Sequence, residues 1–433
     1  MKRAMAVIFF IAAALMLSGC IVGDIDILYS LPQTQEKYQQ LQQLIDAELE
    51  AGSEYSAPTG GSLRQSVQLV EINGDGVEEA VVFLRDENRT PEICVYKQDG
   101  GLYTLAYKLT GQGSSIGHVE YADLNGDGSQ ELIVSWEDND LATVMAYSLR
   151  IGPAEILLTV SCTDFLVGQI YADGDDEELE RNIVATLNMS GKRGVVELFF
   201  TDGNRNVERT QAELSEAMVT ADRFRLSRIS GGTDAVIVEG HFQDAGGVKY
   251  LTDVLVLDGK SLENVALQQG NKSAPVRDVY VFSRDINGDG AIDVPYPMPI
   301  YGGENYYLLD WMTFDAQGGV YLCATTYHDI GQGWYYVLPL EWRDGFSVSY
   351  DGERVTFYTG GEQEVELLRI YVFSGENRNE SAALPGRFVL ARSGTIIYAA
   401  MFPPGSGEYN QKSRDEVIDR FNIITTEWDA GIV

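Results

Sequence analysis

Three short acidic loops place oxygen-bearing side chains at the same spacing. Each reads Asp or Glu, any residue, Asn, Gly, Asp, Gly, and each has a further acid at its ninth position. In such a coiled segment, side chains one, three and five project to one side, and the glycine at position six permits a positive φ. A flexible cage of about six to eight hard oxygen ligands suits Ca²⁺ better than Mg²⁺. The spacing therefore predicts calcium sites.

The predicted ligands come from loop 1 (residues 71–79), loop 2 (123–131) and loop 5 (285–293). They are Glu71, Asn73, Asp75 and Glu79 in loop 1, Asp123, Asn125, Asp127 and Glu131 in loop 2, and Asp285, Asn287, Asp289 and Asp293 in loop 5. Glu71 stands where Asp is usual, and its longer side chain is expected to alter the affinity of loop 1 for calcium. Two weaker copies lie between, one with Asp173, Asp175 and Glu177 and one starting at Ile229 with most of its acids lost.

An EF-hand and a simple polar turn are the two alternatives for these loops. An EF-hand needs a bidentate Glu at position twelve and flanking helices. Position twelve is Val82, Val134 or Tyr296, and the residues after it are strand-like, which excludes an EF-hand. Polar turns between strands are the second alternative, because Asn-Gly and Asp-Gly are common there. Three near-identical acidic loops in a chain of net charge −34 favour calcium over simple turns.

The acidic loops belong to a longer repeat that must position them. Copies follow one another at about 50 to 60 residues, and five units cover residues 61–332. Each unit contains short β-rich runs separated by turns, such as Ala80 to Phe83, Ile93 to Tyr96 and Leu102 to Tyr107. These units fit the four-stranded blade of a β-propeller. Radial closure would let neighbouring blades cover one another, whereas a linear solenoid would need capping ends, which the sequence does not reveal.

The loops, each with a hydrophobic strand after it, resemble the FG-GAP/VCBS repeats of integrin-type β-propellers. The resemblance covers about residues 61–332 and is specific in three of the five repeats. It implies a β-propeller. The five units and the residues after 332 predict a mainly β fold with about five blades followed by a small α+β domain, and five blades depart from the seven common in integrin-type propellers. The resemblance also implies Ca²⁺ in loops 1, 2 and 5 and a role in binding or adhesion. The whole chain is similar to uncharacterised repeat lipoproteins of Gram-positive anaerobes.

The N-terminus indicates export and lipid attachment. Met1 to Arg3 is positively charged, and Ala4 to Leu17 is an uncharged run too short to span a bilayer. The run ends in Leu-Ser-Gly-Cys, which resembles the bacterial lipobox. Residues 1–19 are therefore predicted to be a signal peptide, and Cys20 is predicted to carry lipid that anchors the chain to the membrane. An ordinary secretory signal is the alternative. Both interpretations place the mature protein outside the cytoplasm.

Charge and cysteine content limit the partners. The chain has 65 acidic and 31 basic residues among 433, so its field repels phosphate backbones and excludes sequence-independent nucleic-acid binding. Cys94, Cys162 and Cys323 are far apart and odd in number, which predicts buried side chains and no disulfide framework. Three histidines and four cysteines are too few for most transition-metal sites.

Two segments flank the repeats. Residues 20–60 contain the lipidated N-terminus, an amphipathic helix over Gln35 to Leu49 and a small-residue linker. We expect this helix to pack on the propeller. Residues 333–433 read as a small α+β domain in which Ser413 and Glu416 form a capping box. Its aromatic residues at 334–342 are expected in a core, with a carbohydrate platform as the alternative.

These features together favour a cell-surface binding module for an unknown extracellular protein or carbohydrate ligand. No nucleophile elbow, phosphate-binding loop or His-Glu-x-x-His motif is present, and His328 beside Asp329 is expected to be structural. The protein is therefore expected not to be an enzyme. The alternatives are a carbohydrate-active enzyme, which would need an acid-lined cleft outside the calcium loops, and a structural spacer in the envelope.

Overall fold

Antiparallel sheets dominate the computed structural model. It describes residues 36–139, 141–150, 152–172, 179–201, 203–267, 272–298, 307–359, 365–406 and 411–425. The strands of this part form six sheets, numbered here in chain order. Neighbouring strands of the second, third and fourth sheets are consecutive in sequence, as in a meander. The expectation of a mainly β fold built from several antiparallel sheets is therefore confirmed.

The first three sheets contain thirteen strands between them. These are β1 (Glu54–Tyr55), β2 (Val67–Val70), β3 (Glu79–Arg85), β4 (Pro91–Asp99) and β5 (Leu102–Thr110) in the first sheet; β6 (Ser115–Ala122), β7 (Glu131–Asp138), β8 (Leu141–Ser148) and β9 (Glu155–Cys162) in the second; and β10 (Asp164–Ala172), β11 (Leu179–Asn188), β12 (Val195–Thr201) and β13 (Val207–Glu213) in the third.

The other three sheets contain the remaining strands. These are β14 (Thr220–Arg228), β15 (Asp234–Asp244), β16 (Gly247–Asp258) and β17 (Ser261–Asn264) in the fourth sheet; β18 (Asp293–Met298), β19 (Tyr307–Phe314), β20 (Val320–Asp329), β21 (Trp334–Val337) and β27 (Phe421–Ile423) in the fifth; and β22 (Phe346–Tyr350), β23 (Arg354–Thr359), β24 (Val365–Phe373), β25 (Arg387–Ser393) and β26 (Ile396–Met401) in the sixth.

The helices are short and lie mostly at the two ends of the chain. They are α3 (Glu36–Glu50), α4 (Arg378–Ala382) and α5 (Arg414–Asp419), with 3₁₀ turns at Ser230–Gly232 and Leu340–Trp342. The predicted capping box is confirmed, because Ser413 accepts from the Glu416 backbone N–H while the Glu416 side chain accepts from the Ser413 backbone. A box of this kind satisfies backbone donors that the first helical turn leaves unpaired.

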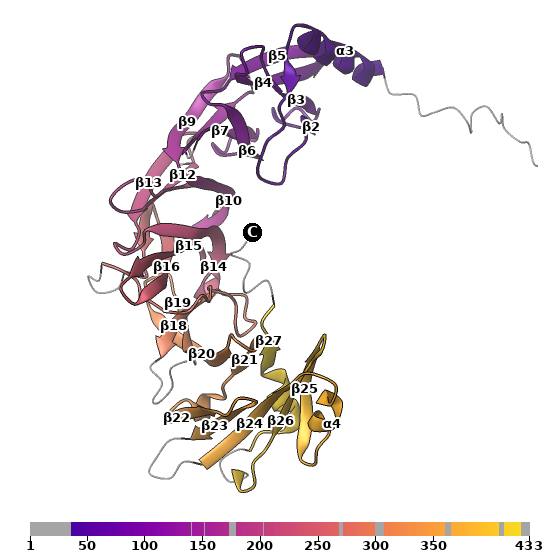
Figure 1. The fold of residues 1–433 in the computed structure, drawn as a ribbon. Coiled ribbons are helices and arrows are strands. Elements are labelled where there is room, and N and C mark those ends of the chain that lie inside the picture. The colour runs from indigo at the N-terminus through magenta and orange to yellow at the C-terminus, as the bar shows by residue number, and fades with distance from the viewer. Residues whose placement is uncertain are drawn as a thin grey trace, which may run out of the picture.

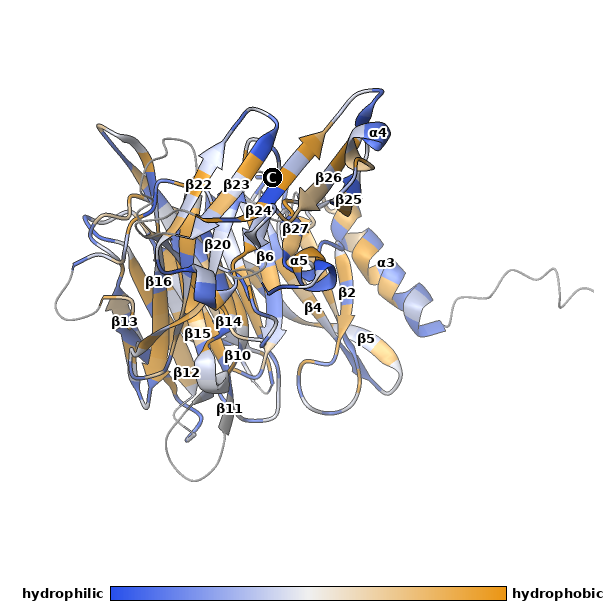
Figure 2. Cartoon of the chain, turned by 90° about the horizontal axis from the view of Figure 1, so that it is seen from below, coloured by the Kyte–Doolittle hydropathy of each residue, from blue (hydrophilic) through white to orange (hydrophobic). Residues whose placement is uncertain are grey.

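Each inner sheet is covered by a neighbour on both faces. In β7, Leu132 and Val134 pack toward the first sheet, whereas Ile133 packs toward the third. Because side chains of a strand alternate between faces, a strand buried on both sides needs a continuous apolar run. Runs such as Ala80 to Phe83 have this physical cause, and the hydrophobic bands along the strands are visible in Figure 2.

The sheets follow one another along an arc. Figure 1 shows the first strands of the second to fourth sheets, β6, β10 and β14, on the inner side, and β9 and β13 on the outer side. The arrangement is propeller-like, but the two ends of the arc lie apart in this view and the described sheets form no closed ring. This differs from the expected radial closure.

Both ends of the arc are covered. At the N-terminal end, Leu41 and Ile45 of α3 are buried against Ala80, Val82 and Tyr96 of the first sheet. Burying an aliphatic side chain of this size contributes about 1.5–3 kcal/mol. The expected amphipathic helix packed on the sheets is thus confirmed. The helix thereby caps this end of the arc, a role that the sequence did not predict for it.

The sixth sheet covers the other end. Phe346 and Phe357 pack against Tyr327, Trp334 and Tyr336 of the fifth sheet. Trp334, Tyr336 and Trp342 are buried, so the expectation of a core rather than a carbohydrate platform is confirmed for these aromatic residues. After the sixth sheet, the chain returns to the fifth, where β27 pairs with β21 at the edge of the sheet.

Candidate calcium-binding loops

The three acidic loops occupy equivalent places in their sheets. Loop 1 joins β2 to β3, and loop 2 joins β6 to β7. Loop 5 precedes β18 and is closed by backbone hydrogen bonds between Arg284 and Asp293. The acid at position nine begins the following strand in each case, and Glu79, Glu131 and Asp293 are all 0–1% exposed.

The backbone of the loops has the predicted coil. In loop 2, Gly126 and Gly128 adopt φ of +73° and +88°, values that favour glycine over other residues. Asp123 Oδ1 accepts from the backbone N–H groups of Gly126 at 2.7 Å and Asp127 at 3.0 Å, and its Oδ2 accepts from Gly128 at 2.9 Å. Asn125 Oδ1 accepts from the Asp127 N–H at 2.9 Å. The side chains at positions one and three are thus fixed by the loop backbone.

The same bonds recur in the other two loops. Asp285 Oδ1 accepts from Gly288 and Asp289 at 2.6 and 3.1 Å. Glu71 Oε1 accepts from Gly74 and Asp75 at 2.7 and 3.2 Å. The longer Glu71 side chain therefore forms the contacts that Asp forms in loops 2 and 5.

The acid at position nine is buried inside loops 1 and 2. Glu131 Oε2 accepts from the Leu124 N–H at 2.9 Å, and its Oε1 accepts from Asn125 Nδ2 at 3.1 Å. Glu79 accepts from Ile72 and Asn73 in the same way, at 3.0 and 2.6 Å. Burial raises the pKa of Glu131 to about 7 and also raises the pKa of Glu79. A nearby cation would favour the charged form of both carboxylates.

Loop 5 holds an incompletely bonded buried carboxylate. Asp293 Oδ2 accepts from the Ile286 N–H at 3.2 Å. Among the described residues, the buried Oδ1 has no hydrogen-bond partner apart from the adjacent Cys323 thiol. Burial raises the pKa of Asp293. A buried acceptor without full hydrogen bonding is destabilising unless another group, such as a cation, completes its shell.

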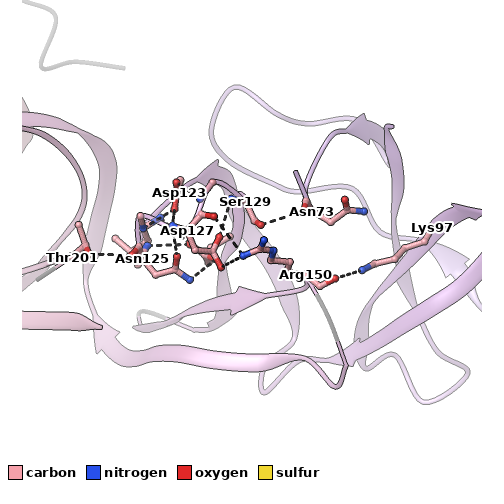
Figure 3. Close-up of polar contacts among 12 residues, drawn as sticks. Asn73, Lys97, Asp123, Asn125, Asp127, Ser129, Arg150 and Thr201 are labelled. Carbon is pink, nitrogen blue, oxygen red and sulfur yellow. Dashed lines mark hydrogen bonds and ion pairs between the residues drawn. The ribbon is translucent and has the colours of Figure 1, made fainter. Parts of the chain in front are cut away.

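The loops also join one sheet to the next. The Gln130 N–H donates to the Ile72 carbonyl at 2.8 Å, which links loop 2 to loop 1. Asn182 Nδ2 of β11 donates to the Asp123 carbonyl at 2.9 Å. Thr201 Oγ1 of β12 donates to the Asn125 carbonyl at 3.1 Å (Figure 3). These bonds place the loops at the joints between sheets.

Two basic residues near loop 2 were not identified from the sequence. Arg150 lies 3.2 Å from Asp127 Oδ2 through Nη1, and Lys97 Nζ donates to the Arg150 carbonyl at 3.0 Å (Figure 3). Arg150 is 23 residues from Asp127 in sequence. No spacing rule joins such distant residues, so the sequence holds no signal for this ion pair.

The donor set of the loops fits calcium. Every side chain at positions one, three, five and nine supplies carboxylate or amide oxygen, which is the ligand type that Ca²⁺ prefers. In the part of the chain that the structure describes, no group of three or more His, Cys, Asp or Glu side chains is gathered in a metal-holding cluster. The oxygens instead accept from loop backbone, from the Asn73 and Asn125 amides and, at Asp127, from Arg150.

Other residues singled out from the sequence have varied outcomes. Cys20 and the Asp173, Asp175 and Glu177 loop lie outside the described residues. The Ile229 copy forms the short 3₁₀ turn, and Cys94 and Cys162 are buried free thiols, as expected. Among the described helices, none has the length and apolar character needed to cross a membrane.

Comparisons with known proteins give only distant likenesses. No family model and no curated protein matches the chain. Among solved structures, it is similar to a Lactobacillus plantarum protein at 11% identity and TM-score 0.27, over 72% of this chain and 85% of that one. It is also similar to the exotype rhamnogalacturonan lyase YesX, at 12% identity and TM-score 0.28, over 81% and 72%. A third is fructofuranosidase from Schwanniomyces occidentalis complexed with fructose, at 9% and 0.26, over 82% and 81%.

One expectation is corrected by these comparisons. The sequence predicted a protein that is not an enzyme, but the similar solved structures include rhamnogalacturonan lyases and a fructofuranosidase. A non-catalytic assignment is therefore withdrawn. The TM-scores are too low for any of these proteins to assign an activity to this chain.

Proposed function

We propose that this protein is a membrane-anchored lipoprotein outside the cytoplasm, and that its Ca²⁺-binding loops stiffen an arc of sheets that binds an extracellular protein or carbohydrate. Glu71, Asn73, Asp75 and Glu79, their counterparts in loop 2, and Asp285, Asn287, Asp289 and Asp293 would hold the ions. Bound calcium would neutralise clustered acids and pre-organise the joints between sheets.

One observation carries this proposal. Three loops far apart in sequence repeat the same coil and the same contacts at position one, and each buries an acid at position nine. Simple turns have no need of a buried acid, because burying a carboxylate without a matched charge is costly. A cation that completes the shell would remove this cost.

We further propose that the first five sheets are FG-GAP/VCBS-type blades and that the sixth is the core of a small C-terminal α+β domain. Loops 1 and 2 each join a strand to the strand that pairs with it, β2 to β3 and β6 to β7. This position, together with the repeated spacing, supports the blade assignment.

Calcium is expected to stabilise the full chain in thermal unfolding. A ligand that binds only the folded state contributes about 2.7 kcal/mol per site at a hundredfold excess over its Kd. The Asp293→Asn variant should lose the contribution of one site, because an amide replaces the buried carboxylate. Unfolding is measured in EDTA, across a calcium titration and across a magnesium titration.

Asp99→Asn is the matched control for this experiment, since Asp99 is an exposed acid at the end of β4, outside the loops. It should respond to calcium like the unaltered chain. A chain whose stability is the same in calcium and EDTA would contradict the calcium proposal, and so would an equal response to magnesium.

Lipid attachment at Cys20 is expected to hold the protein in the membrane fraction. A single acyl chain binds membranes only marginally, so stable anchoring would need more than one chain on the processed cysteine. The Cys20→Ser variant should lose incorporation of labelled fatty acid and move to the soluble fraction. Recovery of an unmodified Cys20 peptide by mass spectrometry would refute the anchor.

A further inference from the structure

One of the three acidic loops is paired with a basic side chain. Arg150 Nη1 lies 3.2 Å from Oδ2 of Asp127, the acid at position five of loop 2 (Figure 3). Within the described residues, this is the only ion pair that reaches an acid of loops 1, 2 or 5. Asp75 and Asp289 hold the same position in loops 1 and 5 and have no such partner among those residues. Loop 2 therefore differs from its counterparts in its electrostatics, although its backbone coil is the same.

The ion pair uses the carboxylate oxygen that the loop backbone leaves open. Asp127 Oδ1 accepts from the Ser129 backbone N–H at 2.9 Å, so the coil of loop 2 fixes this oxygen. Arg150 is the partner of Oδ2, to which no backbone N–H of the described residues donates. Position five supplies one of the predicted calcium ligands. The guanidinium and a calcium ion in loop 2 would therefore draw on the same oxygen.

Loop 2 is also more enclosed than loops 1 and 5 at this position. The Asp127 side chain is 11% exposed, whereas Asp75 and Asp289 are exposed residues. Water screens a charge less where the carboxylate is enclosed. The positive charge of Arg150 therefore acts on loop 2 more strongly than an ion pair on open surface would.

The backbone of Arg150 is fixed by the first sheet. Lys97 Nζ of β4 donates to the carbonyls of Leu149 and Arg150 at 2.6 and 3.0 Å. Tyr107 Oη of β5 donates to the Leu149 carbonyl at 2.9 Å. These bonds hold the segment after β8 against the first sheet and thereby place Arg150 beside loop 2. The contact with Asp127 thus depends on the packing of two sheets.

The Arg150 side chain is still able to leave the loop. It is 39% exposed, and its flexible stem lets the guanidinium turn toward water. Partly exposed ion pairs also contribute little to stability, so release from Asp127 has a small cost. A divalent ion has twice the charge and takes several oxygen ligands at once, so calcium can displace the guanidinium.

We propose that Arg150 is an internal competitor of calcium in loop 2, which lowers the calcium affinity of this loop through its charge and its bond to Asp127. The proposal rests on the calcium-binding role proposed above and names a residue that regulates it. Loop 2 should therefore fill at a higher calcium concentration than it would without Arg150. The joints that loop 2 forms with neighbouring sheets would then respond to calcium in a concentration range of their own.

Calorimetric titration of the full chain with calcium chloride tests this competition. Arg150→Met removes the charge and keeps most of the side-chain length, so one site should bind calcium about three- to tenfold more tightly. Arg150→Gln should give the same gain and replaces the methionine variant if that variant does not fold. An affinity that both variants leave unchanged or weaken would overturn the proposal.

Two controls place the gain in loop 2. Arg85→Met removes an arginine that is 34% exposed and pairs with Glu54 outside the loops, and its calcium affinity should match that of the unaltered chain. In an Asp127→Asn background, the shared carboxylate is gone, so Arg150→Met should bring no further gain. An equal gain with and without Asp127 would show a general effect of net charge and refute the proposal.

Thermal unfolding separates competition from a purely structural contact. In EDTA, Arg150→Met should unfold at a lower temperature than the unaltered chain, because the acids of loop 2 lose their counter-ion. In saturating calcium this difference should shrink or reverse, since tighter binding adds stability. Equal destabilisation in EDTA and in calcium would show that the ion pair only supports the fold.

The two proposals fail in different ways. Calcium that binds and stabilises the unaltered chain, with the same affinity when Arg150 is replaced, would refute only the competition. Calcium that neither binds nor stabilises the unaltered chain would refute the calcium loops, and the role of Arg150 with them.

Discussion

Replacement of Arg277 by methionine is expected to lower the free energy of unfolding by about 3–5 kcal/mol. Arg277 is 1% exposed, and its Nη2 lies 3.7 Å from Oε1 of Glu239, which is 0% exposed. Removing Arg277 leaves the buried Glu239 carboxylate with a single ion-pair partner among the described residues, the partly exposed Arg225 at 3.5 Å from its Oε2. Chemical denaturation at neutral pH, which gives the free energy directly, measures the loss.

The contacts of Arg277 explain why the effect should be large. Its Nε donates to the Val281 carbonyl at 2.7 Å, and Nη1 donates to Thr252 Oγ1 at 3.0 Å. Glu239 Oε1 in turn accepts from the Ser283 N–H at 2.6 Å. The pair therefore fastens the segment before loop 5 to the fourth sheet, and methionine would free that segment as well.

Two further variants give this prediction its controls. Arg85→Met removes the same side chain from an exposed pair with Glu54 and should cost only about 0–1 kcal/mol. The double variant Arg277→Met with Glu239→Gln should recover part of the loss, because the buried carboxylate is removed together with its buried partner. Equal effects of Arg277→Met and Arg85→Met would disprove the role of burial.

Acidification is expected to destabilise the protein through His328. This histidine is 0% exposed, and burial, followed by the charge of Arg284, lowers its pKa from 6.5 to about 3. Above pH 6.5 both folded and unfolded states hold it neutral. As the pH falls from 6.5 toward 3, only the unfolded state takes up the proton, so stability is lost over this range.

The expected loss is about 2 kcal/mol between pH 6.5 and pH 5, from 1.36 kcal/mol for each unit of pKa. The neighbours of His328 agree with a neutral ring. Thr326 Oγ1 accepts from Trp311 Nε1 at 2.7 Å and lies 2.7 Å from His328 Nε2, and the ring stacks on Tyr335. Protonation would place a charge in this apolar setting.

His328→Gln and His328→Phe test the pH effect against the titration of many acids elsewhere. Both remove the titrating group, one with a polar and one with an aromatic replacement. The stability difference between each variant and the unaltered chain should shrink as the pH falls. A constant difference from pH 7 to pH 5 would exclude His328 as the cause.

The sequence predicted the local features well. Glycine positions and acid spacing fixed the coil of loops 1, 2 and 5, because their bonds join residues at most seven apart. The apolar runs predicted strands, and the period of Tyr38, Leu41 and Ile45 predicted α3. In all these cases, chain geometry brings the interacting residues together.

The sequence did not predict the contacts between residues of different sheets. The Arg150 contact with Asp127, the Asn182 bond to loop 2 and the Arg277 pair depend on how one sheet packs on the next. The open arc follows from the angle between successive sheets, a quantity that no short motif encodes.

The open arc has a consequence for how such a protein can change over evolutionary time. A closed ring of sheets fixes the number of sheets, because an added sheet would change the angle between every pair of neighbours. An open stack has no such condition, because each sheet contacts chiefly its neighbours. Duplication of a central sheet, with its acidic loop, would lengthen the molecule and leave both end covers intact. The length of the molecule could thus be adjusted one gene segment at a time.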